Sequence, residues 1–458
     1  MKRTAVLNVV GLTTGLVGQM PRLRQYASRH QMRSIIPAFP AVTCSAQSTY
    51  LTGLTPAGHG IVGNGWYDRD LAEVHFWKQS NHLVHGRKLW EELREQIPGF
   101  TCAKLFWWHN MYSTADYSIT PRPMYPADGS KIFDVYTAPF EIRSAIKKDL
   151  GEFPFRSFWG PGAGIASSRW IAESAKWIEE RFRPSLSLVY LPHLDYNLQK
   201  IGPNDSGIAA DLQLLDDLLG DLISFFEKRE VQLVILSEYG ITAVDHPIHI
   251  NRLLRQQGWI AIKDELGLEM IDCGASKVFA VADHQVAHVY VNDRSVLEQV
   301  RSVLESQAGI ESVHDRKQQV ALGINHPRVG DLVAIADQHS WFTYYYWMDD
   351  AVAPDFARTV DIHRKIGYDP AELFIDPAIK LPAARVAAFL LKKKLHLRSL
   401  LEVVPIDATL VKGSHGRVPE SSHDHPVLIC DQAIAPSADE VRASAVYSLL
   451  RSACLSAG

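Results

Sequence analysis

The chain has 458 residues, of which 47% are hydrophobic and 21% are charged. This balance is that of a globular protein with a large buried core, and it excludes intrinsically disordered and collagen-like classes. Lys and Arg number 47 against 51 Asp and Glu, and the net charge is −4. With no long basic run, the sequence lacks the electrostatic signature of binding to a nucleic-acid polymer, so we expect a small-molecule partner.

Cysteine usage predicts the compartment. The five cysteines are Cys44, Cys102, Cys273, Cys430 and Cys454. They are odd in number, far apart and never in a C-x-x-C pair, which favours reduced thiols in a cytoplasmic protein and argues against a thiolate zinc site.

Two segments raise the question of membranes or export. The apolar run from Ala5 to Val10 is short and no small-x-small cleavage site follows it, so we interpret it as a buried strand. No stretch is long and apolar enough for a membrane span, so we expect no stable membrane insertion. The segment from Phe389 to Leu401 contains Lys392 to Lys394, and it fits either a membrane-surface contact or the edge of a solvated helix.

Short β-branched runs alternate with longer amphipathic stretches along the chain. The predicted buried strands are Thr4 to Val10, Thr101 to Leu105, Leu186 to Leu191, Gln232 to Ser237 and Val286 to Val291. Helical periodicity marks Ser167 to Phe182 and Ile208 to Glu227. Strands separated by helices predict an α/β fold with a doubly wound, mostly parallel sheet, whose ligands sit beyond the carboxyl ends of the strands.

Two regions break this alternation within what we expect to be a single α/β domain over residues 1–458. One is the aromatic-rich stretch over 106–160, and the other spans 340–400. We interpret both as caps inserted over the core.

A threonine near a predicted helix start is the first candidate for chemistry. Thr43 precedes a helical stretch that is closed by Gly53. Free N–H groups and the helix dipole stabilise an anion there and can lower the pKa of a hydroxyl, which suits a nucleophile. The alternative is that Thr43 is simply the N-cap of the helix.

The surrounding segment is similar to a known nucleophile motif. From Pro40 to Asn64 the chain reads PAVTCSAQSTYLTGLTPAGHGIVGN, which resembles the nucleophile segment of the nucleotide pyrophosphatase/phosphodiesterase family in the alkaline phosphatase superfamily. The resemblance implies the alkaline phosphatase-like sheet, a covalent phospho-enzyme at Thr43, and an Asn64 amide that donates to a phosphoryl oxygen. It implies a loop-shaping role for His59, and later motifs extend it to about residue 420.

The same resemblance implies two zinc ions held by six side chains. The corresponding positions here are Val10, Asp195, Gln199, Glu238, Tyr239 and His415. Two ligands are kept, Glu238 replaces an Asp, and the other three are poor ligands, so two ordinary zinc sites cannot be built. We expect a divalent metal bound with fewer family ligands, zinc by resemblance, with Mg or Mn possible because of the carboxylates.

Replacement ligands are available in the second inserted region. Asp361 and His363 stand two apart, project from one face of an extended segment, and are predicted to complete the metal set. A surface salt-bridge cluster with Arg364 and Lys365 is the alternative. The remaining histidine groups with metal-like spacing, which we consider weaker candidates, are His246 and His249, His284 and His288, and His423 to His425.

An aromatic motif lies where the family carries an aromatic side chain beside the leaving group. It contains Trp107, Trp108 and Asn110. Stacking on a base or an apolar alcohol is one interpretation, and core packing under a cap is the other.

Together these features predict a metal-dependent phosphoester hydrolase, of the phosphodiesterase or nucleotide pyrophosphatase kind, acting through a covalent phospho-threonine at Thr43. One alternative is a phosphatase or phosphotransferase acting on a small sugar-like or cyclitol-like alcohol. Another is a catalytically silent binding or scaffold protein that has lost its metals. The physiological substrate and the oligomeric state are not predicted.

Overall fold

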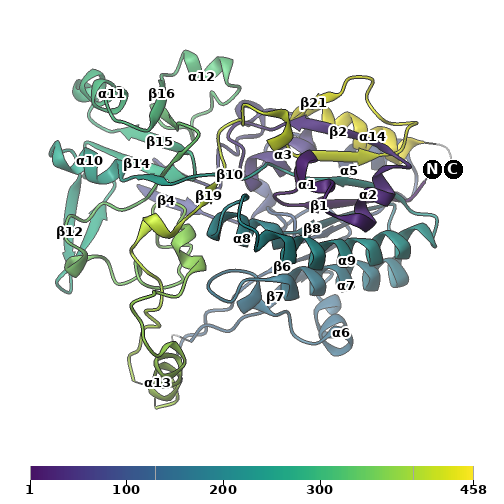
Figure 1. Ribbon diagram of the computed structural model, residues 1–458, viewed down its shortest axis with the longest axis horizontal. Coiled ribbons are helices and arrows are strands. Elements are labelled where there is room, and N and C mark those ends of the chain that lie inside the picture. Colours follow the sequence, from purple (N-terminus) through teal and green to yellow (C-terminus); the bar gives the residue numbers. More distant parts are fainter. Residues whose placement is uncertain (1, 129, 396, 457–458) are drawn as a thin grey trace.

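The computed structural model describes residues 2–128, 130–395 and 397–456, and its centre is a nine-stranded sheet (Figure 1). The strand order is β21-β2-β20-β9-β1-β8-β5-β6-β7. In chain order these strands are β1 (Thr4–Val9), β2 (Gln31–Ile36), β5 (Cys102–Leu105), β6 (Tyr117–Pro121), β7 (Val135–Ala138), β8 (Leu186–Leu191), β9 (Gln232–Leu236), β20 (Val427–Cys430) and β21 (Glu440–Arg442).

The middle of this sheet is parallel and buried on both faces. β1 pairs in parallel with β8 and β9, and β5 pairs in parallel with β8 and β6. Antiparallel pairing occurs where β20 joins β2 and β9 and where β7 closes one edge. All six residues of β1 are buried, which explains its continuous apolar character. The predicted doubly wound, mostly parallel sheet is confirmed.

Helices cover both faces of the sheet. In Figure 1, α7 and α9 lie on one side and α3, α5 and α14 on the other. The helices are α1 (Thr14–Val17), α2 (Pro21–Ala27), α3 (Thr43–Thr52), α4 (Pro56–His59), α5 (Leu89–Gln96), α6 (Glu141–Leu150), α7 (Ile165–Phe182), α8 (His193–Lys200), α9 (Ile208–Glu227), α10 (Ile250–Gln256), α11 (Leu297–Glu305), α12 (Gln318–Ala321), α13 (Pro382–Lys394) and α14 (Val446–Leu455). The two helices expected from periodicity are α7 and α9.

A second sheet forms a separate lobe with its own apolar core (Figure 1). It consists of β14 (Val278–Asp283), β15 (Val286–Val291), β16 (Ile310–His314) and β17 (Leu332–Ala336). All its pairings are antiparallel. The prediction that residues 286–291 belong to the parallel sheet is therefore wrong, because periodicity alone cannot say which sheet a fully buried strand joins.

The remaining strands of the described residues form four two-stranded sheets. They pair β3 (Gly65–Asp68) with β4 (Glu73–Phe76), β10 (Thr242–Ala243) with β19 (Gly413–Ser414), β11 (His246–Ile248) with β18 (Ser340–Phe342), and β12 (Ala261–Glu265) with β13 (Leu268–Asp272).

The two regions interpreted as caps differ in structure. The stretch over 106–160 supplies β6 and β7 to the edge of the main sheet, so it is only partly a cover. The stretch over 340–400 contains β18, short turns and α13, which protrudes from the body in Figure 1. The five cysteines are buried and unpaired. Among the described residues, no helix combines the length and apolar character needed to cross a bilayer.

Candidate active site around Thr43

Thr43 is the first residue of α3, a helix whose residues are all buried. Val42 is the N-cap, and the Thr43 hydroxyl contacts the Tyr239 hydroxyl at 3.1 Å, not the helix backbone. The N-cap alternative is therefore wrong. α3 ends where Gly53 adopts a φ of 71°, the left-handed conformation that suits glycine at a helix terminus.

Side chains from the carboxyl ends of three neighbouring strands meet around Thr43. β1, which carries Asn8, lies between β8 and β9. Asp195 lies in α8, which begins just after β8, and Glu238 and Tyr239 directly follow β9. Because β8, β1 and β9 are parallel, their carboxyl ends face the same edge of the sheet, which is where such folds place ligands.

Hydroxyl groups connect Thr43 to a carboxylate. The Tyr239 hydroxyl donates its single hydrogen to Asp195 Oδ1 at 3.1 Å, so in the contact between the two hydroxyls Thr43 is the donor. Gln199 Nε2 holds the other Asp195 oxygen at 2.8 Å. Burial raises the pKa of Asp195 to about 7, against the lowering effect of the hydrogen bonds from Tyr239 and Gln199. Asp195 is thus placed to accept a proton from Thr43 through Tyr239.

A second carboxyl group, that of Glu238, lies on the other side of the site and is held by amides. Its Oε1 accepts hydrogen bonds from Asn8 Nδ2 at 2.5 Å and from Gln47 Nε2 at 2.6 Å. Burial raises the pKa of Glu238 to about 8, although hydrogen bonds from the Gln47 and Asn8 amides oppose the rise. The sequence interpretation did not single out Gln47. Its position four residues after Thr43, hence on the same side of α3, is the signal that identifies it.

Asn64 joins the start of α3 to the second sheet. Its Oδ1 accepts from the Cys44 backbone N–H at 3.1 Å, and its Nδ2 donates to Asp283 Oδ1 at 3.1 Å. The Asn64 backbone N–H donates to the other Asp283 oxygen at 2.7 Å. Burial raises the pKa of Asp283 to about 7. Asn64 therefore lies beside the start of α3 that carries Thr43, and Asp283 is a neighbour that sequence spacing did not identify.

His415 lies against Tyr239 with the two rings stacked, their centroids 3.6 Å apart. Its Nδ1 donates to the Ala41 carbonyl at 2.7 Å, and burial lowers the pKa of His415 to about 3. The ring is thus neutral, and its Nε2 has no hydrogen-bond partner among the described residues. His284 packs on the other side of His415 at 3.7 Å. One of the weaker histidine candidates, His284, thus belongs to the site.

The residues at the implied metal positions do not fit the family's pair of ions. Val10 is fully buried in the apolar core. The Gln199 amide is engaged with Asp195, and the Tyr239 hydroxyl lies between Thr43 and Asp195. Glu238 replaces an Asp of the family, but its Oε1 accepts hydrogen bonds from the Asn8 and Gln47 amides. Asp195 and His415 remain, with Oδ1 and Nε2 4.0 Å apart, one donor short of the three protein ligands usual at a catalytic zinc. Within the described chain, no group of three or more His, Cys, Asp or Glu is arranged to hold a metal.

The predicted replacement ligands have contacts of their own. The Asp361 backbone N–H donates to Glu372 Oε1 at 3.0 Å, and His363 Nδ1 lies 3.2 Å from the Phe76 carbonyl oxygen. Among the described residues, no hydrogen bond or ion pair joins either one to Asp195 or His415. Their role as metal ligands therefore stays a prediction without support from these contacts.

The salt bridges near Asp361 also differ from those considered in the sequence. Lys365 is buried and pairs with Asp369 at 2.7 Å and Glu372 at 2.6 Å. Arg364 pairs with Asp355 at 2.8 Å. These pairs fix the base of the 340–400 region, and Asp361 takes part only through its backbone.

The aromatic motif is divided between the core and the site. Trp107 is fully buried in the main core, and the Asn110 amide donates to the backbone carbonyls of Lys104 and Ile119. Packing and loop closure explain these two side chains. The Trp108 backbone N–H donates to Gln47 Oε1 at 2.7 Å, which places this residue one contact away from Glu238.

A row of rings leads from the nucleophile toward Trp108. Neighbouring rings are 3.6 to 6.1 Å apart between centroids, and the row consists of Tyr239, His415, His284, Tyr368, Trp77 and Trp108. We call it the aromatic row. His415 and His284 each pack between two other rings of the row, so these two side chains serve as packing beside the site.

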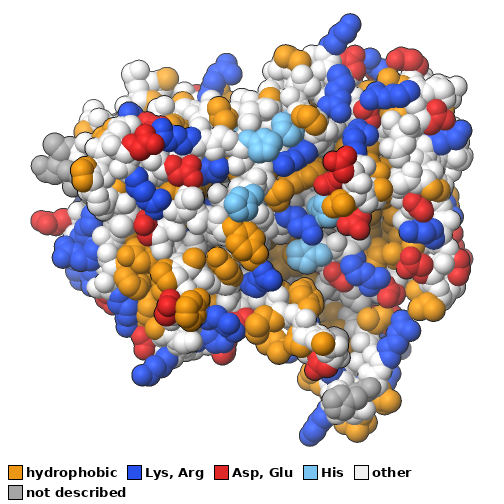
Figure 2. Space-filling view, turned by 180° about the vertical axis from the view of Figure 1, so that it is seen from behind, with side chains coloured by type: hydrophobic (Ala, Val, Ile, Leu, Met, Phe, Trp, Pro, Cys, Tyr) orange, Lys and Arg blue, Asp and Glu red, His pale blue; other side chains and the backbone are white. Residues whose placement is uncertain are grey.

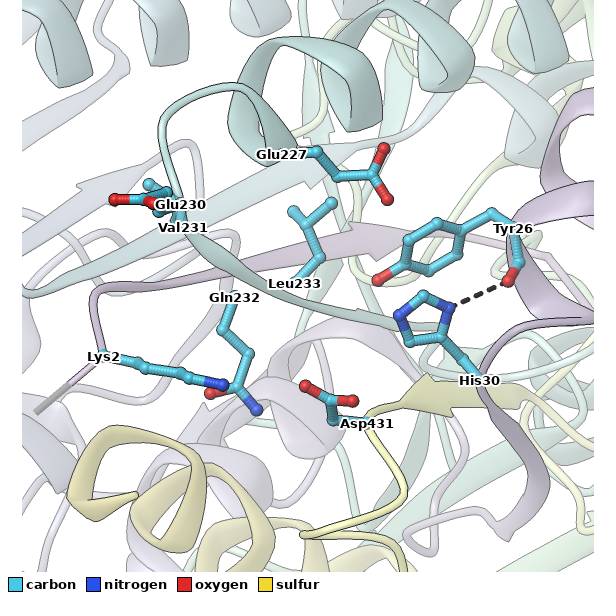
Figure 3. A pocket seen from close by; sticks show the side chains of 9 residues that line it. All are labelled: Lys2, Tyr26, His30, Glu227, Glu230, Val231, Gln232, Leu233 and Asp431. Carbon is cyan, nitrogen blue, oxygen red and sulfur yellow. Dashed lines mark hydrogen bonds between the residues drawn. The ribbon is translucent and has the colours of Figure 1, made fainter. Parts of the chain in front are cut away.

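A cavity of about 310 Å³ lies elsewhere (Figure 3). Lys2 and Gln232, at the amino ends of β1 and β9, line it together with His30 and Asp431. Thr43 lies beyond the opposite ends of these strands, so this cavity does not belong to the site.

Sequence comparisons identify similar proteins. A model of the family described as type I phosphodiesterase/nucleotide pyrophosphatase matches residues 4–369. A pyrophosphatase/phosphodiesterase of Schizosaccharomyces pombe, described as uncharacterized, is 25% identical over 252 residues, which cover 52% of this chain and 43% of that protein. A venom phosphodiesterase of Naja atra is 25% identical over 218 residues, covering 45% of this chain and 21% of that one. The matched part therefore spans less than half the length of either relative.

Solved structures share the fold. Murine ectonucleotide pyrophosphatase/phosphodiesterase 5, as an inactive variant in complex with AMP, gives a TM-score of 0.60 at 14% identity, covering 100% of this chain and 96% of that one. Phosphonoacetate hydrolase from Sinorhizobium meliloti 1021, in complex with phosphonoformate, gives 0.62 at 13% identity, with coverages of 99% and 96%. At such identities the similarity shows a common alkaline phosphatase-like fold.

Proposed function

The chain belongs to the type I phosphodiesterase/nucleotide pyrophosphatase family, and we propose that it is a phosphoric ester hydrolase with Thr43 as its nucleophile. The observation that carries this proposal is the chain of hydrogen bonds from Thr43 through Tyr239 to Asp195. A threonine hydroxyl is a weak nucleophile unless a base removes its proton, and this arrangement supplies a base through one intervening phenol.

The proton path follows from the direction of these bonds. As the Thr43 oxygen attacks phosphorus, its proton passes to the Tyr239 oxygen while the Tyr239 proton passes to Asp195. The phenol is unchanged, and one proton has moved from Thr43 to Asp195. The bond from phosphorus to the leaving oxygen breaks on the side opposite Thr43, and that oxygen takes a proton from solvent. Water then hydrolyses the phospho-threonine and gives up a proton to solvent, while the proton on Asp195 returns through Tyr239 to the Thr43 oxygen. Because the pKa of Asp195 is raised to about 7, it suits both roles near neutral pH.

Neutral acids and amides supply the groups that face the phosphoryl oxygens. Burial raises the pKa of Glu238 to about 8, so this carboxyl group is mostly protonated at neutral pH and able to donate a hydrogen bond. The second hydrogen of the Asn64 amide is also available for a phosphoryl oxygen, since the described structure engages only one, with Asp283. The start of α3 adds a favourable dipole.

The family generally depends on divalent metals, yet none of these steps requires one. An amide, that of Gln199, and a hydroxyl, that of Tyr239, occupy the positions of two family ligands, so proton transfer and hydrogen bonding take the place that metal coordination has elsewhere in the family. Without a fixed cation, buried carboxyl groups disfavour a doubly charged phosphomonoester more than a singly charged diester. We therefore propose as the substrate class a phosphodiester or a pyrophosphate diester, in which the phosphoryl group under attack carries a single negative charge.

The five buried thiols support a reducing compartment, and we propose a cytoplasmic location.

A chromogenic phosphodiester, bis(p-nitrophenyl) phosphate, tests the hydrolase. The protein is assayed with and without EDTA, and the reaction is quenched for peptide mass spectrometry. We expect turnover that persists in EDTA and a phosphoryl adduct on the peptide that carries Thr43. A matched control is Thr55→Ala, an exposed threonine in the same segment, which should behave as wild type. Turnover without any adduct at Thr43 would contradict the mechanism.

A catalytically silent binding protein is a second candidate, and the replaced metal positions favour it. Under this alternative, the protein binds a nucleoside monophosphate measurably in calorimetry but shows no turnover above that of Thr43→Ala under any metal condition. AMP is a suitable first probe, because a protein of the same fold was solved with it.

A further inference from the structure

Helix α13 and the residues around it form a protrusion from the 340–400 region (Figure 1). None of the helix residues is buried, and only Pro382, Val386 and Phe389 are half-buried. We call residues 381–395 and 397–401 the α13 tip. A helix of 13 residues gains little stability from local propensity alone, so one that packs so little on its own protein is a candidate for contact with something else.

The tip exposes large apolar side chains. Six leucines are 44 to 71% exposed, namely Leu381, Leu390, Leu391, Leu395, Leu397 and Leu400. A single exposed leucine on a surface needs no explanation, but six within 20 consecutive positions of one protrusion form a patch of the kind that marks an interaction surface.

The same segment is strongly basic. Residues 377–401 contain Lys380, Arg385, Lys392, Lys393, Lys394 and Arg398, and no Asp or Glu. The chain as a whole has a net charge of −4, so this concentration of positive charge is local. In Figure 2, basic and apolar side chains are intermixed on the protrusion at the lower edge of the molecule. The partner should therefore be anionic as well as apolar.

We propose that the α13 tip docks on an anionic lipid bilayer. Leucines enter the boundary between headgroups and acyl chains, while long lysine side chains reach back to the phosphate layer. A second copy of the chain fits poorly, because two such tips would bring like charges together. A nucleic acid would use the lysines but has no site for the six leucines. The bilayer is the partner that uses both features.

The base of the protrusion is firmly fixed, which suits an anchor. Lys365, Asp369 and Glu372 form a buried ion cluster, and Trp159 Nε1 donates to Glu372 Oε2 at 2.5 Å. The neighbouring Tyr368 hydroxyl donates to Gln199 Oε1 at 3.1 Å, so the base also contacts the site around Thr43. The docking proposal rests on exposure and charge and does not depend on any catalytic activity.

Vesicle co-sedimentation of the full chain tests the proposal. Vesicles are made of phosphatidylcholine alone or of equimolar phosphatidylcholine and phosphatidylglycerol. We expect sedimentation only with the anionic vesicles, weakened by added salt. The variant K392E/K393E/K394E should lower the apparent affinity roughly 100-fold. Leu390→Ser combined with Leu391→Ser should lower the apparent affinity about tenfold or more, because the bilayer then buries two leucine side chains fewer.

The control reverses the same charge elsewhere. The variant K148E/K228E/K317E alters three exposed lysines outside the tip and should bind vesicles as wild type does. All variants change exposed positions, and equal melting temperatures will verify folding. No binding to anionic vesicles, or binding that both tip variants retain, overturns the proposal. Concentration-dependent self-association lost in the leucine variant, or binding to RNA that the leucine variant retains in place of vesicle binding, also overturns it.

Discussion

Two regions meet at the Thr43 hydroxyl, namely the segment from Pro40 to Asn64 and the segments that follow β8 and β9. These two regions depart from the family pattern to very different degrees. The first keeps the form of the nucleophile motif, and in the structure it delivers Thr43 to the start of a buried helix. The second keeps Asp195 but has Gln199, Glu238 and Tyr239 where metal ligands are implied.

The replacements in the loops are mutually compatible. Gln199 donates to Asp195, Tyr239 links Asp195 to Thr43, and Glu238 is held by Asn8 and Gln47. Buried carboxyl groups are costly unless they are neutral or hydrogen-bonded, and here they are satisfied by amides and a phenol. The comparison teaches that the segment around Thr43 can keep the family pattern while the side chains that surround its hydroxyl change chemical class.

The largest effect is expected from the nucleophile itself. Thr43→Ala should lower phosphodiester turnover by on the order of 10⁴-fold or more, because it removes the hydroxyl proposed to form the covalent intermediate. Steady-state assay and circular dichroism measure activity and folding. Turnover close to that of the wild type in a folded variant would remove Thr43 from the mechanism.

The next largest effect concerns the Tyr239 link. Tyr239→Phe removes the phenol oxygen and should lower turnover by about 100-fold or more, the usual contribution of a positioned proton acceptor. In the wild type, turnover should rise with pH through about 7, because Asp195 must be ionised to accept the proton. In Tyr239→Phe this rise should disappear.

A suitable control is Tyr345→Phe, since that buried hydroxyl has no hydrogen-bond partner among the described residues. It should keep both the rate and the pH profile. A Tyr239→Phe variant that is slower but keeps the rise through pH 7 would make Tyr239 a structural residue only.

The metal content of a variant tests whether the replaced ligand at Gln199 limits zinc binding. Gln199→His would place a third nitrogen or oxygen donor beside Asp195 and His415, the number found at catalytic zinc sites. After dialysis against zinc and then buffer, we expect this variant to retain more zinc per chain than the wild type, as measured by plasma mass spectrometry. A wild-type protein that already retains one ion per chain would show that the two remaining family ligands suffice.

The smallest effect is on stability. Burial raises the pKa of Glu238 from 4.5 to about 8, so its contribution to folding stability is fully present below pH 4.5 and is lost as the pH rises through about 8. Glu238→Gln removes this ionisation. As the pH rises from mildly acidic to above 8, the urea concentration at the unfolding midpoint should therefore fall less for the variant than for the wild type. Parallel pH dependence in the two proteins would mean that Glu238 is not protonated in the folded state.

The sequence by itself determined the α/β class, four strands of the central sheet (β1, β5, β8 and β9), the helices α7 and α9, and the position of Thr43 near a helix start. These follow from local periodicity and from one contiguous motif, both of which are properties of neighbouring residues. Asp195, Glu238, Asn64 and His415 were also found in the sequence as members of the site, through the resemblance to the family.

Only the tertiary structure decided how those residues act. Tyr239 was a lost ligand in the sequence and is a bridging hydroxyl in the structure, because β8, β1 and β9 bring their ends together across more than two hundred residues. Gln47, Asp283 and His284 also belong to the site through contacts made in the folded chain, with Glu238, Asn64 and His415 respectively. Asp361 and His363 had suitable spacing, but their contacts lie with Glu372 and Phe76. Spacing along the chain fixes which side chains share a face, whereas the contacts between distant segments depend on packing of the whole core.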